Sequence, residues 1–507
     1  MKLLHVIDNF LNKYTTYFVV LNALIIISTA AIILGFFGMI SYSGTHLLQS
    51  VAILLIVCFV ANLIFSKIFN VPSNKESSLI TALILFLIMQ PAESTAGIFG
   101  LLLAGVISMG SKYILQKHKK HIFNPAALAV FVLGFNAATV AIWWVATPML
   151  LPFTAILGLL IVRKIRKFHL FFSFLITAFL TVLTFRILNN QGGPELIIEA
   201  FTSWPLVFFA TVMLTEPRTI PSIKKYQMIY GLLTGVLFGA QFRIGPIYAS
   251  PEFALIIGNI FTFFVNPKHN FQLAVSEIKK LSSDIYGFSF TPDEKLSFAP
   301  GQYLEWTVPH KRPDLRGNRR YFTIASSPTE DKLQLGVKIS EGYSSYKTAL
   351  LKIDKGTKVL AGSLSGDFML PENATQKLVF IAGGIGITPF RSMIKYLVDT
   401  KQKRDLTLFY VSASPSDFVY KDLFDQAGYS TGVKTLYVIT KPENTPKNWN
   451  GRTGRINEQM IREEVPDYKE RKFYISGPNA MIQAYKEILA SLEIAKTQII
   501  TDYFPGF

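Results

Sequence analysis

Cysteine is nearly absent from this sequence. Cys58 is the only cysteine among 507 residues, and it lies inside an apolar run. A single thiol excludes an intramolecular disulfide and an iron–sulfur cluster, which is held by about four thiolates. Histidine is scarce as well, and all seven histidines lie at the ends of the apolar runs or outside them. We therefore expect no metal site, and no pair of histidines placed to hold a haem within a membrane span.

Charged residues are also few, at 16% of the chain, and they are distributed unevenly. Up to about residue 266 the sequence is a series of long apolar runs, whereas beyond it charges are frequent and apolar runs are short. An ordinary soluble domain is not composed in this way over so long a stretch. We place a domain boundary within Phe263–Gln272, so that the first domain covers residues 1–267.

Acidic residues are rare within the apolar runs. Glu93, Glu195, Glu199 and Glu252 lie near the ends of runs or in loops. Ion pumps carry ionisable residues at depth in the membrane, so the sequence argues against pumping by this chain alone. The net charge of +17 is attributed to basic cytoplasmic loops, and no nucleic-acid partner is expected.

Ten apolar segments are candidate membrane spans, although three are short for a bilayer core that takes about 20 residues per helix. They lie at 15–38, 46–66, 77–90, 94–115, 125–146, 149–162, 168–188, 203–215, 226–242 and 250–266. With the N-terminus inside, the interior loops collect Lys and Arg, and the exterior loops contain only Arg186 and Arg243. This alternation predicts a multi-pass protein of the cell membrane whose N-terminus and C-terminal half are cytoplasmic.

The rest of the chain changes pattern twice. Residues 268–375 contain β-type runs separated by turn signals, which predicts a barrel or sandwich. Residues 376–507 alternate short apolar strands with helices, which predicts a doubly wound α/β domain. The expected fold is a multi-pass α-helical membrane domain of about ten helices, fused to a β-barrel domain and an α/β domain.

A strand, a glycine turn and a helix follow one another in the stretch LVFIAGGIGITPFRSMIKYL. Gly383, Gly384 and Gly386 allow the backbone to approach a ligand closely. Thr388 is expected to cap the helix, and Pro389 fits its first position. Such a helix N-terminus favours anionic phosphates, so the stretch predicts a dinucleotide-binding loop.

Three further motifs accompany this loop. RYFTIASSP (Arg320–Pro328) and GVKISEGYSSYKTAL (Gly336–Leu350) lie before it, and YISGPNAM (Tyr474–Met481) lies after it. In this order and spacing, over residues 268–507, the motifs resemble those of the ferredoxin–NADP reductase superfamily. The resemblance implies that the β-barrel domain binds FAD and that the α/β domain binds NADH or NADPH.

The resemblance also assigns roles in flavin binding. Arg320 would neutralise the FAD diphosphate with its planar fork, while Phe322 would offer an aromatic face and Thr323 would hydrogen-bond flavin N5 or O4. Ser344 and Ser345 would hold the diphosphate. The flavin-binding residues implied are Arg320, Tyr321, Phe322, Thr323, Val337, Lys338, Ser344 and Ser345.

The nucleotide site is implied by the same comparison. Ser476 replaces the cysteine that is usual in the superfamily and would contact the nicotinamide, and the terminal Phe507 would stack on the flavin until nicotinamide displaces it. Thr323, Ser476 and Phe507 are therefore the expected catalytic residues. Asp417 would meet a ribose and favour NADH, although Lys421 leaves NADPH open. The nucleotide-binding residues implied are Gly383, Gly384, Gly386, Thr388, Pro389, Asp417, Gly477 and Pro478.

Four apolar stretches in the first half carry a second resemblance: SSLITALILFLIMQP, HIFNPAALAVF, FFATVMLTEPRT and YGLLTGVLFG. Across most of residues 15–266 they resemble the flavin-carrying membrane subunits of two respiratory complexes, the Rnf ferredoxin:NAD oxidoreductase and the sodium-translocating NADH:quinone reductase. Members of that family carry flavin in the membrane. The resemblance implies a second flavin, FMN or riboflavin, held by Asn124, Pro125, Thr215, Glu216, Arg218 and Thr219.

Covalent attachment of that flavin would require a threonine outside the cytoplasm. Thr147, in Ala146-Thr147-Pro148, lies in an expected exterior loop, but the acid and the Ser or Gly of the family's attachment motif are missing. Non-covalent flavin is therefore expected. Trp143 and Trp144 could stack on a flavin, but interfacial tryptophans are common in membrane proteins.

The function expected from these motifs is transfer of electrons from cytoplasmic NAD(P)H through FAD to a membrane flavin. The onward acceptor would be an extracytoplasmic flavoprotein or a quinone. Three alternatives stay open: a quinone reductase without transfer across the membrane, a haem-containing reductase of the ferric-reductase type, and a transporter with a nucleotide-sensing domain. The sequence leaves the oligomeric state and the terminal acceptor undetermined.

Overall fold

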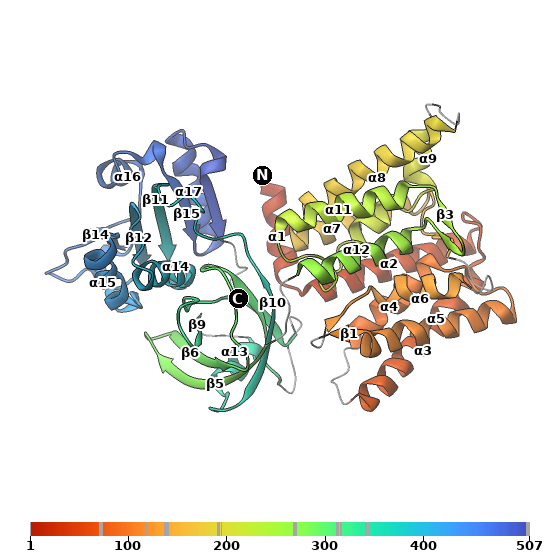
Figure 1. The fold of residues 1–507 in the computed structure, drawn as a ribbon, viewed down its shortest axis with the longest axis horizontal. Coiled ribbons are helices and arrows are strands. Elements are labelled where there is room, and N and C mark those ends of the chain that lie inside the picture. The colour runs from red at the N-terminus through yellow and green to blue at the C-terminus, as the bar shows by residue number, and fades with distance from the viewer. Residues whose placement is uncertain are drawn as a thin grey trace. The chain divides into compact units, whose positions relative to one another are not determined.

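The structure is a computed structural model of the 507-residue chain. It describes residues 2–69, 75–117, 120–135, 141–189, 193, 195–266, 271–310, 314, 317–339, 342 and 344–502. The chain divides into two compact units, Met1–Lys268 and His269–Phe507, which we call the helical unit and the sheet unit (Figure 1).

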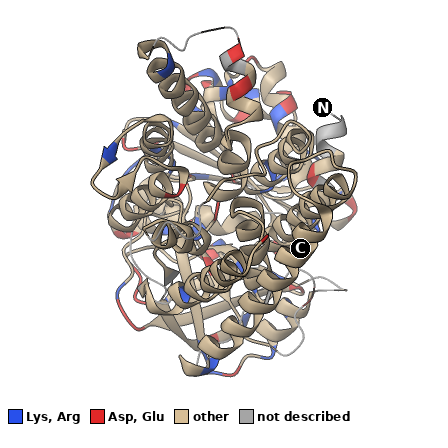
Figure 2. Cartoon of the chain, turned by 90° about the vertical axis from the view of Figure 1, so that its right-hand side faces the viewer, with Lys and Arg blue, Asp and Glu red and all other residues tan. Residues whose placement is uncertain are grey.

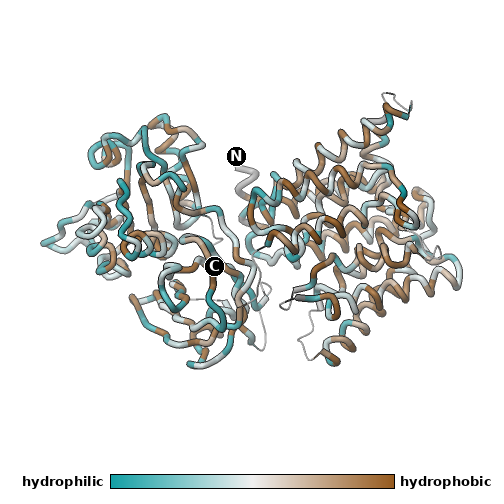
Figure 3. Tube along the Cα trace, viewed as in Figure 1, coloured by the Kyte–Doolittle hydropathy of each residue, from teal (hydrophilic) through white to brown (hydrophobic). Residues whose placement is uncertain are grey.

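Apolar helices make up nearly all of the helical unit. They are α1 (Lys2–Asn12), α2 (Thr16–Phe36), α3 (Gly44–Ile68), α4 (Lys75–Ile88), α5 (Thr95–Ile114), α6 (Pro125–Gly134), α7 (Leu151–Ile165), α8 (Phe168–Leu188), α9 (Glu195–Thr202), α10 (Leu206–Phe208) with the π-helical turn η1 (Phe209–Met213), α11 (Lys224–Gly239) and α12 (Pro251–Val265). Figure 3 shows the hydrophobic colour along these helices, and Figure 2 shows that most of the helical ribbon facing the viewer carries no charge.

Four of these helices are long and apolar enough to cross a membrane: α2, α3, α5 and α8. Their outward faces carry large apolar side chains, such as Ile56 on α3, which is 64% exposed, and Ile176 on α8, which is 56% exposed. A helix that is apolar on its outer face as well is typical of a membrane span. A helix lies in each of the ten predicted segments, but the number of spans stays a prediction beyond these four.

The span predicted for residues 125–146 is wrong in its length. Helix α6 ends at Gly134, and residues 141–150 contain no helix. The latter segment instead runs against the end of α4, where the backbone N–H groups of Ile142 and Trp143 donate to the Ile88 carbonyl at 3.0 and 2.9 Å. These bonds satisfy a helix end that would otherwise be left without partners, so irregular backbone is accommodated inside the unit.

An internal repeat, which the sequence did not reveal, organises the helical unit. Helix α5 is followed by a hairpin, β1 (Gln116–Lys117) with β2 (Lys120–His121), and then by α6; helix α11 is followed by β3 (Arg243–Ile244) with β4 (Ile247–Tyr248), and then by α12. A capping residue and a proline begin both α6 and α12. The two hairpins lie at opposite ends of the unit (Figure 1).

Each repeat also contains a short helix that is buried on all sides. In the first repeat, every residue from 81 to 89, at the C-terminal end of α4, is buried. In the second, every residue from 208 to 215, around η1, is buried. Both segments end shortly before a proline, Pro91 and Pro217. Two short apolar segments at corresponding positions of two repeats are typical of membrane proteins that build a site at the repeat interface.

The sheet unit begins with a curled antiparallel sheet of order β8-β7-β10-β5-β6-β9. Its elements are β5 (Phe271–Lys280), β6 (Ile285–Pro292), β7 (Tyr303–Thr307), β8 (Arg319–Thr323), β9 (Leu333–Lys338), α13 (Ser345–Leu351) and β10 (Lys358–Ser365). The edge strands β8 and β9 are not paired with each other in the described residues, so the six strands of the predicted barrel or sandwich form a curled sheet that is open at this edge.

A parallel sheet of order β14-β13-β12-β11-β15-β16 follows, which we call the α/β sheet. Its elements are β11 (Leu378–Gly383), α14 (Thr388–Asp399), β12 (Leu406–Ser412), α15 (Lys421–Thr431), β13 (Lys434–Ile439), β14 (Arg452–Thr453), α16 (Glu458–Glu464), β15 (Lys472–Ser476), α17 (Asn479–Ser491) and β16 (Ile499–Asp502). Strands β11 and β12 are buried over their whole length, because α14 and α15 cover one face and α16 and α17 the other.

Candidate active site

A cavity of about 570 Å³ lies in the sheet unit, within the size range of ligand sites. It borders β8 and β9 of the curled sheet and the carboxyl ends of β11, β12 and β15 of the α/β sheet. Strand order reverses between β11 and β15, and ligands of open α/β sheets bind at such a switch point. The position of the cavity therefore follows from the topology of the sheet.

Most residues predicted for the reductase site line this one cavity. The predicted residues that line it are Arg320, Tyr321, Phe322, Thr323, Val337, Lys338, Ser344, Gly383, Gly384, Gly386, Thr388, Asp417, Ser476, Gly477 and Pro478. Ser345 and Pro389 are not among its lining residues. Phe507 lies outside the described residues.

The glycine loop continues β11 into the tight 3₁₀ turn η2 (Gly384–Ile387), from which α14 starts. A Cβ atom added to Gly386 would lie 2.4 Å from the Ser476 carbonyl oxygen, so only glycine fits against the loop that follows β15. The predicted capping role of Thr388 is wrong. Its hydroxyl donates to the Ile385 carbonyl at 3.2 Å, and no side chain caps α14.

Arg320 places a positive charge at the edge of the cavity. Its guanidinium donates to Asp314 Oδ1 at 3.2 Å and lies over the Tyr346 ring, with 5.1 Å from Cζ to the ring centroid. Phe322, two residues along β8, packs against the same tyrosine at 5.9 Å between ring centroids. The buried Tyr346 thus holds both side chains of the Arg-x-Phe motif in one orientation.

The two serines of the second motif differ in orientation. Ser344 caps α13 by accepting from the Lys347 N–H at 3.4 Å, and it lines the cavity. Ser345 instead accepts from the Asp314 N–H at 2.9 Å, and its hydroxyl lies 3.1 Å from His310 Nε2. A cation and a hydroxyl thus face the cavity beside an aromatic ring, and this donor set fits an FAD diphosphate and isoalloxazine.

Asp502 is a buried lining residue that sequence reasoning missed. It ends β16 and is the register partner of Ser476 on β15. Burial raises the pKa of this carboxyl to about 8, although the Ser476 hydroxyl opposes the shift. Its Oδ2 atom is buried without a hydrogen-bond partner in the described part of the chain. The sequence places Asp502 directly before the terminal aromatic residues, in TDYF. This position does not reveal how β16 is aligned with β15, so the sequence alone does not bring Asp502 next to Ser476.

Replacing Asp502 with asparagine is expected to flatten the pH dependence of the stability of this unit. The folded carboxyl keeps its proton up to about pH 8, whereas an unfolded aspartate loses it near pH 4. Between these values the folded state binds more protons, so the stability of the natural protein falls as pH rises, by at most about 1.4 kcal/mol per pH unit. Thermal unfolding, followed by the fluorescence of released flavin at about pH 5 and about pH 8, measures this. Equal pH dependence in both proteins would contradict the shift.

Asp417 lies at the opposite end of the cavity, beyond β12. Its Oδ1 accepts from the Ser282 hydroxyl at 3.2 Å, and its Oδ2 from the Ser412 hydroxyl at 3.4 Å. Ser412 and Thr440 line the cavity beside it. The carboxylate is therefore fixed in position at the carboxyl ends of two strands of the α/β sheet.

A second polar cluster lies in the helical unit and joins residues that are 92 positions apart. Glu216 Oε2 accepts from Asn124 Nδ2 at 2.9 Å and from the Thr219 hydroxyl at 3.3 Å. Glu216 Oε1 lies 3.0 Å from His121 Nε2. Four of the residues predicted for a membrane flavin, Asn124, Pro125, Thr215 and Glu216, line a common hollow, whereas Thr147, Arg218 and Thr219 do not.

This hollow does not fit a flavin as it stands. Its volume is about 50 Å³, room for one or two water molecules, whereas ligand sites start at about 300 Å³. The polar groups of Glu216 are already bound within the cluster. Thr147 lies in the irregular segment 141–150, and its hydroxyl is buried without a partner among the described residues.

Among the described residues, no group of three or more His, Cys, Asp or Glu side chains is placed to hold a metal ion. His121 lies against Glu216, and His169 Nε2 lies 2.5 Å from Gln227 Oε1. Each of these histidines is therefore bound to a neighbour of its own.

Comparison with known proteins concerns the sheet unit. The model of the oxidoreductase NAD-binding domain matches residues 380–487. The chain is 28% identical over 195 residues to the stachydrine N-demethylase reductase subunit Stc4 of Rhizobium meliloti, and 28% identical over 242 residues to NADH-cytochrome b5 reductase 1 of Ajellomyces capsulatus. These matches cover 38% and 46% of this chain and 54% and 76% of the relatives.

A third relative is the glycine betaine monooxygenase reductase subunit of Chromohalobacter salexigens, 25% identical over 45% of this chain and 62% of its own length. The chain thus spans little more than half the length of two of these relatives. Among solved structures, the cytochrome P450 reductase GcoB of Amycolatopsis is similar over 46% of this chain and 70% of its own, with 23% identity and a TM-score of 0.42. The C-terminal half of the chain therefore matches the NAD(P)H-dependent, FAD-binding reductase domains of the ferredoxin–NADP reductase type.

Proposed function

We propose that this chain is a membrane-bound oxidoreductase that takes electrons from NAD(P)H in the sheet unit and delivers them to an acceptor at the helical unit. The observation that carries the proposal is the single cavity in which the glycine loop and the Arg-x-Phe-Thr strand face each other. The same chain contains four helices long and apolar enough to cross a membrane. Joined to such helices, the reductase domain would deliver its electrons to an acceptor in or across the bilayer.

The residues of the cavity divide the work between two ligands. Arg320 and Ser344 would hold the FAD diphosphate, Phe322 would offer an aromatic face to the flavin, and Thr323 would hydrogen-bond its reactive edge. FAD, when bound, accepts a hydride and releases electrons singly. The η2 turn and the N-terminus of α14 would hold the pyrophosphate of the nicotinamide nucleotide. Ser476, which lines the same cavity, would contact the edge of the nicotinamide ring.

The acceptor at the helical unit is proposed from the resemblance of its sequence. A second flavin, FMN or riboflavin, bound without a covalent link, would continue the path toward an extracytoplasmic flavoprotein or a quinone. The hollow beside Asn124 and Glu216 is too small for an isoalloxazine, so such a flavin requires either an opening of that cluster or another place in the unit. The basic hairpin β1–β2 supports placing the sheet unit in the cytoplasm.

Asp417 is expected to make NADH the preferred reductant. A carboxylate fixed beside the adenosine ribose accepts hydrogen bonds from its hydroxyls and repels the 2′-phosphate of NADPH. Asp417→Ala is expected to lower kcat/KM for NADH about tenfold, the loss of a hydrogen bond to a charged group, and to raise it for NADPH. Asp422→Ala removes a carboxylate that is exposed on α15 and is the matched control. An unchanged ratio of the two kcat/KM values would contradict this role.

The flavin content of the purified protein tests the proposed function. The protein is solubilised in detergent, its visible spectrum is recorded, and the flavin released by acid is identified. FAD with FMN or riboflavin, at about one each per chain, supports a two-flavin path. FAD alone, without a haem absorption band, would contradict a second flavin and favour a quinone reductase. A haem absorption band would contradict both of these readings and favour a haem-containing reductase of the ferric-reductase type.

Steady-state reduction of an artificial acceptor completes this test. NADH or NADPH is expected to drive it at the FAD site. A protein that binds the nucleotide but reduces no acceptor would overturn the proposal in favour of a transporter with a nucleotide-sensing domain.

A further inference from the structure

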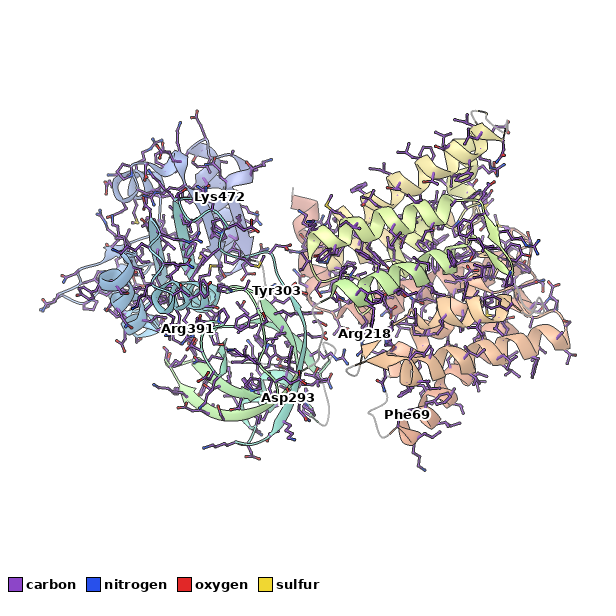
Figure 4. All side chains as sticks on the ribbon, in the orientation of Figure 1. Phe69, Arg218, Asp293, Tyr303, Arg391 and Lys472 are labelled. Carbon is purple, nitrogen blue, oxygen red and sulfur yellow. The ribbon has the colours of Figure 1, made fainter. Side chains whose placement is uncertain are left out.

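A buried ion pair joins the two sheets of the sheet unit, and none of the predicted site residues takes part in it. Arg391 lies on α14, between the two sheets (Figure 4). Its Nη2 atom donates to Glu330 Oε1 at 2.8 Å, and its Nη1 atom donates to Glu330 Oε2. The side chains are 9% and 18% exposed, so the pair is shielded from solvent.

The partner segment directly follows the strand that lines the flavin side of the cavity. Arg391 Nη1 also donates to the Ala325 carbonyl at 3.0 Å, two residues after Thr323. Glu330 Oε2 accepts from the Ser327 N–H at 2.7 Å, which folds residues 325–330 into a compact turn. The Glu330 carboxylate thus stabilises the turn of residues 325–330 and holds the Arg391 guanidinium at the same time.

The arginine is equally close to the nucleotide side. It lies three residues after Thr388 and five after Gly386, both of which line the cavity. Ser392, the next residue of α14, donates to the Ser326 carbonyl at 2.6 Å. The guanidinium also lies over the ring of Tyr420, with 5.5 Å from Cζ to the centroid. One turn of helix therefore connects the phosphate-binding loop to the flavin-binding strand.

Apolar contacts do join the two sheets, but they are non-directional and fix a relative position less precisely than an ion pair does. The curled sheet has a hydrophobic core of its own, while Ile285 of β6 and Phe368 pack into the core of the α/β sheet, and no strand pairs across the two sheets in the described residues. A bidentate guanidinium–carboxylate pair fixes both distance and angle, because two parallel bonds must be satisfied together. Hydride transfer depends on such precision, since a misplacement of about 1 Å can cost about 100-fold in rate.

We propose that Arg391 and Glu330 are positioning residues that set the approach of the nicotinamide to the flavin. In the reaction, C4 of NADH gives a hydride to FAD, a proton is taken up, and NAD⁺ and the reduced FAD remain. Neither residue lines the cavity. The pair acts on the hydride step by holding α14 against residues 325–330, and it contributes little to binding of the nucleotide. The inference rests on the proposed reduction of FAD by NADH in this cavity.

Rapid mixing of the full-length protein with NADH in detergent tests the pair. In Arg391→Met and Glu330→Gln, the rate constant of FAD reduction at saturating NADH is expected to fall about 10- to 100-fold. The dissociation constant of NADH is expected to change less than about threefold, and the long-wavelength absorbance of the nicotinamide–flavin contact is expected to weaken. The double variant is expected to be no slower than the slower single variant, because the two residues act as one unit.

Arg462→Met provides the matched control, because it removes an arginine that pairs with Glu458 on the exposed α16. Full-rate reduction of FAD in both single variants would overturn the positioning role, as would an effect confined to the NADH dissociation constant. If Arg391→Met loses FAD, the near-isosteric Glu330→Gln decides by the same criteria. Failure of NADH to reduce the natural protein would instead overturn the proposed function, so the two failures are distinguishable.

Discussion

Gly386→Ala is expected to abolish reduction of bound FAD by NADH while FAD itself stays bound. A Cβ atom at this position would lie 2.4 Å from the carbonyl oxygen of Ser476, 2.6 Å from its carbonyl carbon and 2.7 Å from the nitrogen of Gly477. All three are backbone atoms, which cannot rotate away as a side chain could. The η2 turn must then move away from the loop after β15, and these two segments form the nucleotide side of the cavity.

The expected loss of FAD reduction is large. A shift of about 1 Å would move the η2 turn, which is proposed to hold the nucleotide phosphates, away from Ser476, which is proposed to contact the nicotinamide ring. The decay of oxidised-flavin absorbance after mixing with NADH measures this loss, and FAD content is determined on the same sample. Gly428→Ala is the control, since a Cβ there would meet only the Val433 carbonyl at an ordinary 3.5 Å, on a helix where alanine is favoured. Reduction of Gly386→Ala at the natural rate would show that the loop does not carry the nucleotide.

Arg320→Ala is expected to leave the protein largely free of FAD. The guanidinium lines the cavity beside Ser344, where Lys338 and Lys347 also lie, and it is held in place by Asp314 and the Tyr346 ring. Each hydrogen bond from a charged group to a phosphate contributes about 1.5–3 kcal/mol, so loss of one such bond weakens FAD binding by about 10- to 150-fold.

Arg319→Ala is the matched control for this substitution. Arg319 is the neighbouring residue of β8, does not line the cavity, and lies 3.7 Å from Glu305 in a partly exposed pair. Such pairs contribute little. Titration of the flavin-stripped protein with FAD, followed by quenching of flavin fluorescence, gives both dissociation constants. Equal affinity in the two variants would remove Arg320 from the flavin site.

The parts of the site that are encoded locally could be predicted from the sequence. The glycine loop, the Arg-x-Phe-Thr strand and the Ser-Gly-Pro turn each place several neighbouring residues at one edge of a sheet, and all three line the cavity. Asp502 and Arg391 could not be predicted in the same way. The first depends on the register of β16 against β15, and the second on how α14 packs against a turn 61 residues earlier.

The errors have physical reasons as well. Thr388 was expected to cap α14, but the chain enters that helix through a 3₁₀ turn, so the threonine already has helical backbone angles. Residues 125–146 are apolar enough for a span, yet hydropathy does not reveal that residues 142–145 complete the hydrogen bonds at the end of α4. For residues 268–375 the sequence predicted a barrel or sandwich, and alternation along strands does not fix whether the edge strands β8 and β9 meet.

In the proposed membrane protein, the duplicated arms of the helical unit would have a consequence for insertion. The α5–hairpin–α6 arm and the α11–hairpin–α12 arm share one backbone plan, so the plan carries no information about which side of a bilayer each should face. That information resides in charge: the first hairpin contains Lys117 and Lys120, and the second contains Arg243. During synthesis, a few basic residues in the loops would therefore decide the orientation of the protein in the membrane. Moving these charges from one hairpin to the other would favour the inverted orientation, although the backbone plan stays the same.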